Sequence, residues 1–177
     1  MAQAWLALGS NLGDKRANLH QALVCLHQPP EVEVVQVSSV YQTQPLGMSP
    51  NTPWFYNMVA WVTCRLSPQD LLHHCQQTEE RLGRTPRPTG TTLPQNRTVD
   101  VDLLSYDDLC LNEATLTLPH PRMAERAFVL VPLLELAPDW HHPRLGLTVA
   151  QLHLALSTLQ TVELVDSLTW PMAETSV

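Results

Sequence analysis

The spacing of hydrophobic residues along the chain predicts strands and helices in alternation. Short runs rich in β-branched, aromatic and other apolar residues predict strands over residues 4–8, 32–41, 54–65 and 97–104. Two longer stretches repeat apolar residues every three or four positions, as the buried face of an amphipathic helix does, over residues 14–27 and 67–83. The chain therefore begins with the order strand–helix–strand–strand–helix–strand.

This order predicts an α+β fold. It is the split βαβ arrangement of a ferredoxin-like α/β sandwich, in which the sheet is mostly antiparallel and helices pack on one face of it. Further along, the pattern predicts a short hairpin, an extended apolar segment before Pro132 with a short helix after it, a helix after Thr148 and a last strand. We expect a single domain over residues 1–165, followed by a C-terminal tail over residues 166–177.

The second helix carries recognisable start and stop residues. Ser67 is a typical N-cap, Pro68 suits the first helical position and Asp70 places an acid in the first turn. Gly83 follows the last periodic residue, as glycine often does after a helix. The boundaries of this helix are therefore predicted from local sequence alone.

Two long segments connect these elements. Residues 42–53 contain several prolines and are too long for a simple hairpin. Residues 84–96 are rich in Pro, Thr and Gly and have no hydrophobic period, so we expect them to be mobile. Long loops in compact domains are often functional, which makes both segments candidates for a role at a site.

Composition and charge narrow the classes of function. The chain has 177 residues, of which 44% are hydrophobic and 15% charged, as in a globular domain with its own core. The net charge of -7 argues against binding nucleic acid or an anionic membrane, which favour a basic surface. We find no signal-peptide pattern and no apolar run of membrane-spanning length. The four cysteines are scattered, as free thiols in a reducing compartment are, and we expect a cytoplasmic protein.

Two aspartates in the predicted strand 97–104 are candidate metal ligands. Side chains alternate across a strand, so Asp100 and Asp102 share one face while Val101 lies on the other. Two such carboxylates lie roughly 7 Å apart at the backbone, and a divalent cation between them turns their repulsion into attraction. Mg²⁺ favours one or two carboxylates together with substrate phosphates, and Arg97 could bind the same phosphates. The alternative is an ordinary strand edge whose aspartates face solvent.

A succession of motifs over residues 4–140 resembles one enzyme family. The motifs are Leu8-Gly9-Ser10-Asn11-Leu12-Gly13, Ser39-Val40-Tyr41-Gln42-Thr43, Pro45-Leu46-Gly47, Asn57, Glu79 with Leu82-Gly83-Arg84, Arg97-Thr98-Val99-Asp100-Val101-Asp102, Pro119-His120-Pro121 and Arg126-Ala127-Phe128. Each motif alone has little specificity, but their order and spacing together are specific. Together they resemble the 6-hydroxymethyl-7,8-dihydropterin pyrophosphokinases of folate biosynthesis.

The resemblance implies transfer of the β,γ-pyrophosphoryl group of ATP to the hydroxymethyl oxygen of the pterin, with release of AMP. It implies catalytic roles for Arg84, Arg97, Asp100 and Asp102, the two aspartates holding two Mg²⁺ ions that bridge the triphosphate. The implied nucleotide-binding residues are Gln76, Glu79, Arg84, Arg97, Leu103, Thr117, His120 and Arg126. The implied pterin-binding residues are Thr43, Gln44, Leu46, Phe55, Asn57, Asp100 and Phe128.

Other interpretations stay open at this point. A non-catalytic protein that binds pterin or nucleotide is one, because the segment before Arg97 lacks a tryptophan that family members often carry. Another Mg²⁺-dependent nucleotide transferase would release ADP or pyrophosphate instead of AMP. An RNA-binding module is disfavoured by the charge of -7 and by the lack of an aromatic ribonucleoprotein motif. We expect the partners to be ATP and the pterin alone, and the protein to be a monomer.

Overall fold

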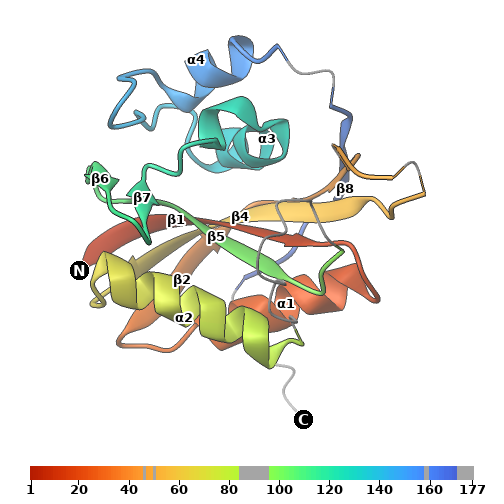
Figure 1. Ribbon diagram of the computed structural model, residues 1–177, viewed down its shortest axis with the longest axis horizontal. Helices are drawn as coiled ribbons and strands as arrows, with labels where there is room; N and C mark the ends of the chain where they lie inside the picture. The colour runs from red at the N-terminus through yellow and green to blue at the C-terminus, as the bar shows by residue number, and fades with distance from the viewer. Residues whose placement is uncertain (46, 50, 84–95, 158–159, 171–177) are drawn as a thin grey trace.

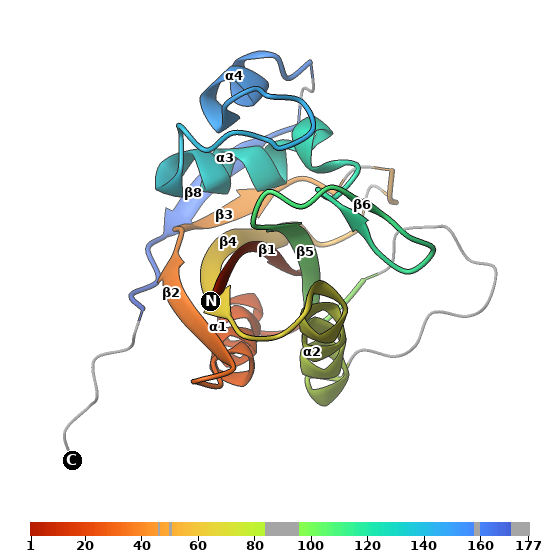
Figure 2. The ribbon, with the colours of Figure 1, turned by 90° about the vertical axis from the view of Figure 1, so that its left-hand side faces the viewer.

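A computed structural model describes residues 1–45, 47–49, 51–83, 96–157 and 160–170. The elements in chain order are β1 (Ala2–Ser10), α1 (Lys15–Leu26), β2 (Val32–Val37), β3 (Val40–Thr43), β4 (Phe55–Cys64), α2 (Pro68–Arg81), β5 (Asp100–Tyr106), β6 (Leu111–Asn112), β7 (Thr117–Leu118), the 3₁₀ helix η1 (Met123–Glu125), α3 (Ala127–Leu136), α4 (Val149–Leu154) and β8 (Val162–Asp166). The main sheet lies between two pairs of helices, α1 with α2 and α3 with α4 (Figures 1 and 2). Within the described ranges, every helix is too short or too polar to cross a membrane.

The main sheet has six strands in the order β5-β1-β4-β3-β8, and β2 also pairs with β4. All of these pairs are antiparallel. Strand β4 lies between β1 and the β2–β3 strands that precede it in sequence, which is the split βαβ arrangement. The predicted α+β fold with a mostly antiparallel sheet is confirmed.

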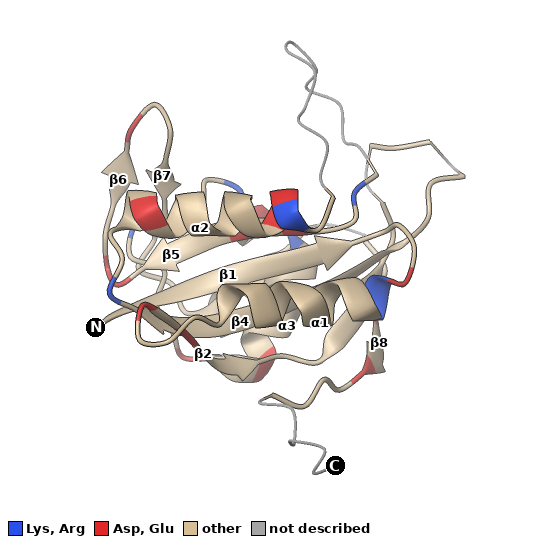
Figure 3. Ribbon diagram, turned by 90° about the horizontal axis from the view of Figure 1, so that it is seen from below, with Lys and Arg blue, Asp and Glu red and all other residues tan. Residues whose placement is uncertain are grey.

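Helices α1 and α2 lie side by side across one face of the sheet (Figure 3). Leu6 and Leu8 of β1 point to this face and are buried in the same apolar cluster as Leu19 and Leu23 of α1. At the start of α2 the predicted cap is present, because the side chain of Ser67 accepts a hydrogen bond from the backbone N–H of Asp70. The amphipathic pattern thus predicts both helices and the face that they bury.

Helices α3 and α4 cover the opposite face, so the prediction of helices on one face only is wrong. Trp5 of β1 and Leu104 of β5 are buried there in one cluster with Leu130 and Leu133 of α3. Because both faces of the sheet are covered, β1 reads as a continuous apolar run and shows no alternation with polar residues.

Helix α3 also differs from its prediction. An extended segment was expected up to Pro132, yet residues Ala127–Leu136 form one helix with this proline inside it. The segment is almost wholly apolar, so it has no polar face from which a helical period could be recognised. Proline inside a helical pattern usually marks the end of a helix, so the sequence around Pro132 favours an extended segment before it.

The strand predicted over residues 32–41 is interrupted at Ser38. Its backbone N–H donates to the carbonyl of Val59 and its hydroxyl accepts from the N–H of Val59, both at 2.9 Å. Directly after this break, the carboxylate of Glu135 in α3 accepts hydrogen bonds from the N–H and hydroxyl of Ser39 and from the hydroxyl of Tyr41. Burial and this carboxylate raise the pKa of Tyr41 to about 12. Glu135 therefore fastens α3 to the sheet.

Residues 166–170, which follow the predicted end of the domain, still contact the sheet. Asp166 is the last residue of β8, which pairs with β3. Leu168 is buried, and the indole N–H of Trp170 donates to the carbonyl of Val34 at 2.9 Å. We therefore propose that the single domain extends at least to Trp170.

Candidate active site

Asp100 and Asp102 stand at the beginning of β5. The residues that alternate with them, Val101 and Leu103, are buried against the helices α1 and α2. Leu104 lies on the same face of the strand as the aspartates and is buried in the cluster around α3. The two carboxylate side chains remain partly accessible, with exposed fractions of 20% for Asp100 and 34% for Asp102. Both can therefore bind a ligand from solvent.

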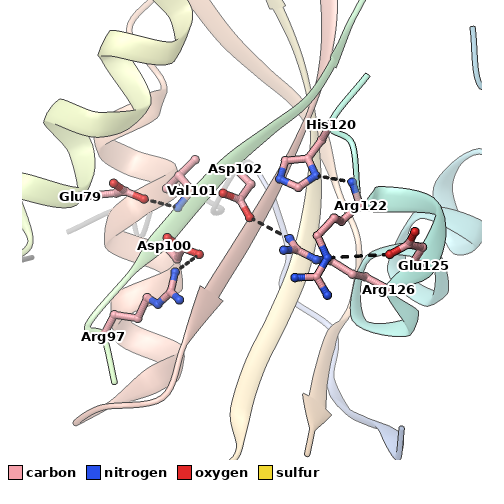
Figure 4. A network of polar contacts seen from close by, with 9 residues as sticks. All are labelled: Glu79, Arg97, Asp100, Val101, Asp102, His120, Arg122, Glu125 and Arg126. Atoms are coloured by element: carbon pink, nitrogen blue, oxygen red, sulfur yellow. Dashed lines mark hydrogen bonds and ion pairs between the residues drawn. The ribbon is translucent and has the colours of Figure 1, made fainter. Parts of the chain in front are cut away.

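Each aspartate faces an arginine (Figure 4). Arg97, just before the strand, forms an ion pair with Asp100, and Nη1 of Arg126 lies 3.5 Å from Oδ2 of Asp102. Burial lowers the pKa of Arg126, while Asp102 acts in the opposite direction. Guanidinium groups bind phosphate oxygens in a planar, often bidentate geometry. The arrangement of two carboxylates beside two guanidinium groups suits a metal-bound polyphosphate.

His120 lies next to this charged cluster. Its backbone N–H donates to the carbonyl of Leu104 at 2.7 Å, which holds the residue beside β5. The backbone N–H of Arg122 donates to Nδ1 of His120 at 3.2 Å, so the neutral ring carries its proton on Nε2. Burial, together with the charge of Arg126, lowers the pKa of His120 to about 4. The imidazole is therefore neutral at neutral pH.

Asn57 of β4 offers an amide on the same face of the sheet. It pairs with Gly9 of β1 across the ladder, and its amide nitrogen donates to the hydroxyl of Thr43. A Cβ atom added at Gly9 would lie 2.8 Å from Oδ1 of Asn57, closer than non-bonded atoms can approach. The strand predicted over residues 4–8 continues through Gly9 to Ser10. A side chain at this position would force the amide of Asn57 to shift, because that amide occupies the space.

A pocket of about 450 Å³ joins the charged cluster to this amide. The residues predicted for the site that line it are Thr43, Gln44, Phe55, Asn57, Arg97, Asp100, Asp102, His120, Arg126 and Phe128. Residues that line it without having been predicted are Ala7, Leu8, Gly9, Pro45, Met48, Arg122, Glu125 and Gln160. The pocket therefore combines charged side chains with an amide and two phenyl rings, and the guanidinium of Arg126 lies 5.4 Å from the ring centroid of Phe128.

Four other predicted residues do not line this pocket and belong to β5 or to the elements packed against it, α2 and β7. Gln76 is exposed on α2, Leu103 is buried, and Thr117 belongs to β7. Glu79 of α2 is 4% exposed, and its carboxylate accepts a hydrogen bond from the backbone N–H of Val101 at 2.7 Å (Figure 4). Two further predicted residues, Leu46 and Arg84, lie outside the described residues, as does the segment 84–95.

Among the pocket residues that were not predicted, some lie next to a predicted site residue in the sequence and others do not. Arg122 follows His120 in the Pro-His-Pro-Arg sequence, so its charge could have been assigned to the same site. Gln160 is far away in sequence and reaches the pocket through the pairing of β8 with β3. No sequence pattern near Gln160 predicts that it lines the pocket.

A known family accounts for most of the chain. The family model for 7,8-dihydro-6-hydroxymethylpterin-pyrophosphokinase (HPPK) matches residues 5–138. The chain belongs to this family. The 2-amino-4-hydroxy-6-hydroxymethyldihydropteridine pyrophosphokinase of Bacillus subtilis is 42% identical over 133 residues, which cover 75% of this chain and 77% of that protein. A Synechocystis protein of the same name is 38% identical over 171 residues, covering 96% of this chain and 80% of that protein.

Some relatives are much longer than this HPPK chain. The folic acid synthesis protein fol1 of Schizosaccharomyces pombe is 40% identical over 140 residues, which are 79% of this chain but 18% of that protein. A crystal structure of an HPPK-DHPS in complex with substrates has a TM-score of 0.69 at 12% identity, covering 86% of this chain and 42% of that one. At such identity the likeness shows the fold alone. The resemblance seen in the motifs is confirmed, and with it the prediction of an enzyme, a pyrophosphokinase of folate biosynthesis.

HPPK enzymes use ATP, generally with Mg²⁺. Asp100 and Asp102 fit this ion because they offer hard oxygen ligands on one strand face and open into a pocket with room for phosphates. No cluster of three or more His, Cys, Asp or Glu side chains suited to a metal occurs among the described residues. The two carboxylates stay the predicted protein ligands.

His120 should make the stability of this protein depend on pH. Its pKa is about 4 in the folded protein against 6.5 for an ordinary histidine, so between these values the unfolded chain binds more protons. We expect the free energy of unfolding to fall as the pH drops from 6.5 to 4, and to fall less in His120→Gln. Denaturant unfolding of both proteins across this window measures the difference. An equal loss in both proteins would show that His120 is not held neutral by the fold.

Proposed function

We propose that this chain transfers the β,γ-pyrophosphoryl group of ATP to the hydroxymethyl group of 6-hydroxymethyl-7,8-dihydropterin. The main support for the proposal is that one pocket of about 450 Å³ is lined both by charged groups and by an amide with two phenyl rings. Asp100 and Asp102 with Arg126 suit a metal-bound triphosphate. Asn57 can pair with donors and acceptors of a flat heterocycle, and Phe128 can pack against its face.

In this proposal the hydroxyl oxygen of the pterin attacks the β-phosphorus of ATP in line. The new bond from this oxygen to phosphorus forms as the bond from phosphorus to the oxygen of AMP breaks, and the hydroxyl proton is released. Arg97 and Arg126 bind non-bridging phosphate oxygens, and Asn57 with the two phenyl rings orients the pterin and its hydroxymethyl group. Two bound Mg²⁺ ions, held by Asp100 and Asp102, would supply neutralisation of the triphosphate charge. Positioning and charge neutralisation then account for most of the acceleration.

The outer edge of β5 is the proposed place of the nucleotide base and ribose. Helix α2, with Gln76, and strand β7, with Thr117, both lie against this strand. Glu79 acts there through β5, because its carboxylate is bonded to the N–H of Val101. The role of Arg84 in assisting the transfer and that of Leu46 in the pterin pocket stay predictions. We also propose a cytoplasmic monomer whose partners are the two small substrates.

One assay tests this function against its alternatives. The protein is mixed with Mg²⁺, ATP and the hydroxymethyl pterin, and all nucleotide and pterin products are quantified. We expect AMP and pterin diphosphate in equal amounts. Release of ADP or pyrophosphate would indicate another nucleotide transferase, and ligand binding without any product would indicate a non-catalytic relative.

A further inference from the structure

The short segment 10–15, from the last residue of β1 to the first residue of α1, contacts the stretch that leads into β5 and the stretch that leads into β4. The register of the sheet places it there, because Gly9 pairs with Asp100 at the start of β5, and Ser10 pairs with Tyr56 at the start of β4. Asn11 and Lys15 are the two polar residues of the segment that reach these stretches. Neither belongs to the described residues that line the pocket. Both could therefore act on the site only through other residues.

Asn11 binds the stretch that carries Arg97. Its side-chain oxygen accepts a hydrogen bond from the backbone N–H of Arg97, and its side-chain nitrogen donates to Oδ1 of Asn96, each at 2.8 Å. Its own backbone N–H donates to the carbonyl of Arg97 at 3.2 Å. Asn11 is 2% exposed, so its own amide is shielded from competing water. They fix the backbone of Arg97, whose side chain pairs with Asp100.

Lys15 binds the stretch that enters β4. Its ammonium group donates to the carbonyl of Trp54 at 3.0 Å and lies 4.3 Å from the centroid of the Tyr56 ring. Phe55 stands between these two residues, and Asn57 follows directly after them. Both line the pocket. The contact of Asn11 with this stretch is longer, 3.4 Å from its side-chain nitrogen to the carbonyl of Pro53.

We propose that Asn11 and Lys15 are positioning residues with separate tasks. Asn11 places Arg97 for the transfer step, and Lys15 places the start of β4 for binding of the pterin. The inference rests on the proposed function, since it assigns these tasks within that reaction. It predicts that two residues only four positions apart in the chain affect different kinetic constants.

The test is steady-state kinetics of AMP formation for Asn11→Ala, Asn11→Asp, Lys15→Met and Lys15→Arg, with the melting temperature of each variant. Because Asn11→Ala removes both side-chain bonds to the Arg97 stretch, we expect kcat about tenfold lower and the pterin KM within about twofold of wild type. Asn11→Asp keeps the acceptor for the N–H of Arg97, and the amide of Asn96 can rotate to donate to it, so most of kcat should return. Lys15→Met should raise the pterin KM about fivefold with little change in kcat, and Lys15→Arg should restore it.

The outcomes separate this inference from the proposed function. Wild type that forms no AMP contradicts the proposed function and the inference with it. Two results with an active wild type overturn the inference only. One is that Asn11→Ala and Lys15→Met change the same kinetic constant. The other is that the loss of activity in each variant follows its melting temperature alone. Should Asn11→Ala not fold, Asn96→Ala decides, because it removes one exposed partner of Asn11: we expect kcat about threefold lower, and an unchanged kcat overturns the proposal.

Discussion

Replacing Asp102 with asparagine should lower the rate of AMP formation by about a thousandfold while the protein stays folded. Asparagine keeps the shape of the side chain but removes the negative charge that attracts a divalent cation. The same result is expected for Asp100→Asn, because both carboxylates share the open face at the start of β5. The rate is measured by separating AMP from ATP, at several concentrations of Mg²⁺, and the fold is checked by thermal unfolding.

The stability of these variants should change little. Asp102 and Arg126 are 3.5 Å apart and both partly exposed, and such ion pairs contribute about 0–1 kcal/mol. A matched control is Asp108→Asn, which removes an exposed carboxylate from the turn that follows the same strand. It should leave the rate unchanged. An Asp100 or Asp102 variant with more than about a tenth of the wild-type rate would show that the metal assignment is wrong.

The parts of the fold that can be predicted are those in which apolar residues repeat at a regular spacing along the sequence. The buried residues of α1 recur every three or four positions, at Leu19, Ala22, Leu23 and Leu26. Helix α2 has one apolar and one polar face and begins at the cap residue Ser67. Helix α3 was missed because nearly every residue in it is apolar, so the period is invisible. The break between β2 and β3 was missed because Ser38 makes its decisive hydrogen bonds to Val59, a residue far along the chain.

The same distinction holds for the site. Arg97 and Asp100 are three residues apart, so their proximity follows from local sequence. The contact of Gly9 with Asn57 depends on the register between β1 and β4, which sequence does not reveal. Glu79 accepts a hydrogen bond from the backbone N–H of Val101 on an edge strand. Such a contact cannot be predicted from residue types, because every residue except proline has a backbone N–H. The sequence pattern therefore identifies candidate site residues. The pairing of the strands in the structure is needed to show which of these residues line the same pocket.

Gly9→Ala is the second substitution from which we expect a large effect. The added Cβ would lie 2.8 Å from Oδ1 of Asn57, so the amide must move and its hydrogen bond to Thr43 must distort. We expect the pterin KM to rise about tenfold or more, because a buried amide is left in the wrong place for the ligand. Overpacking at this point should also cost about 1–3 kcal/mol of stability. Kinetics at varied pterin concentration and denaturant unfolding measure the two effects.

Gly146→Ala separates the loss of stability from the loss of binding. Gly146 has a φ of +66° and no atom within contact of an added Cβ, so alanine there strains the backbone away from the pocket. This control should lose stability and keep the pterin KM of wild type.

A double variant tests the mechanism of the Gly9 effect. If the new methyl group acts only by displacing the amide, Gly9→Ala should raise the pterin KM no further once Asn57 is alanine. The KM of the double variant should then equal that of Asn57→Ala alone, because the shorter side chain leaves room for the methyl group. Independent effects that multiply in the double variant would instead mean that Gly9 contacts the pterin directly, and that the clash with Asn57 does not explain the need for glycine.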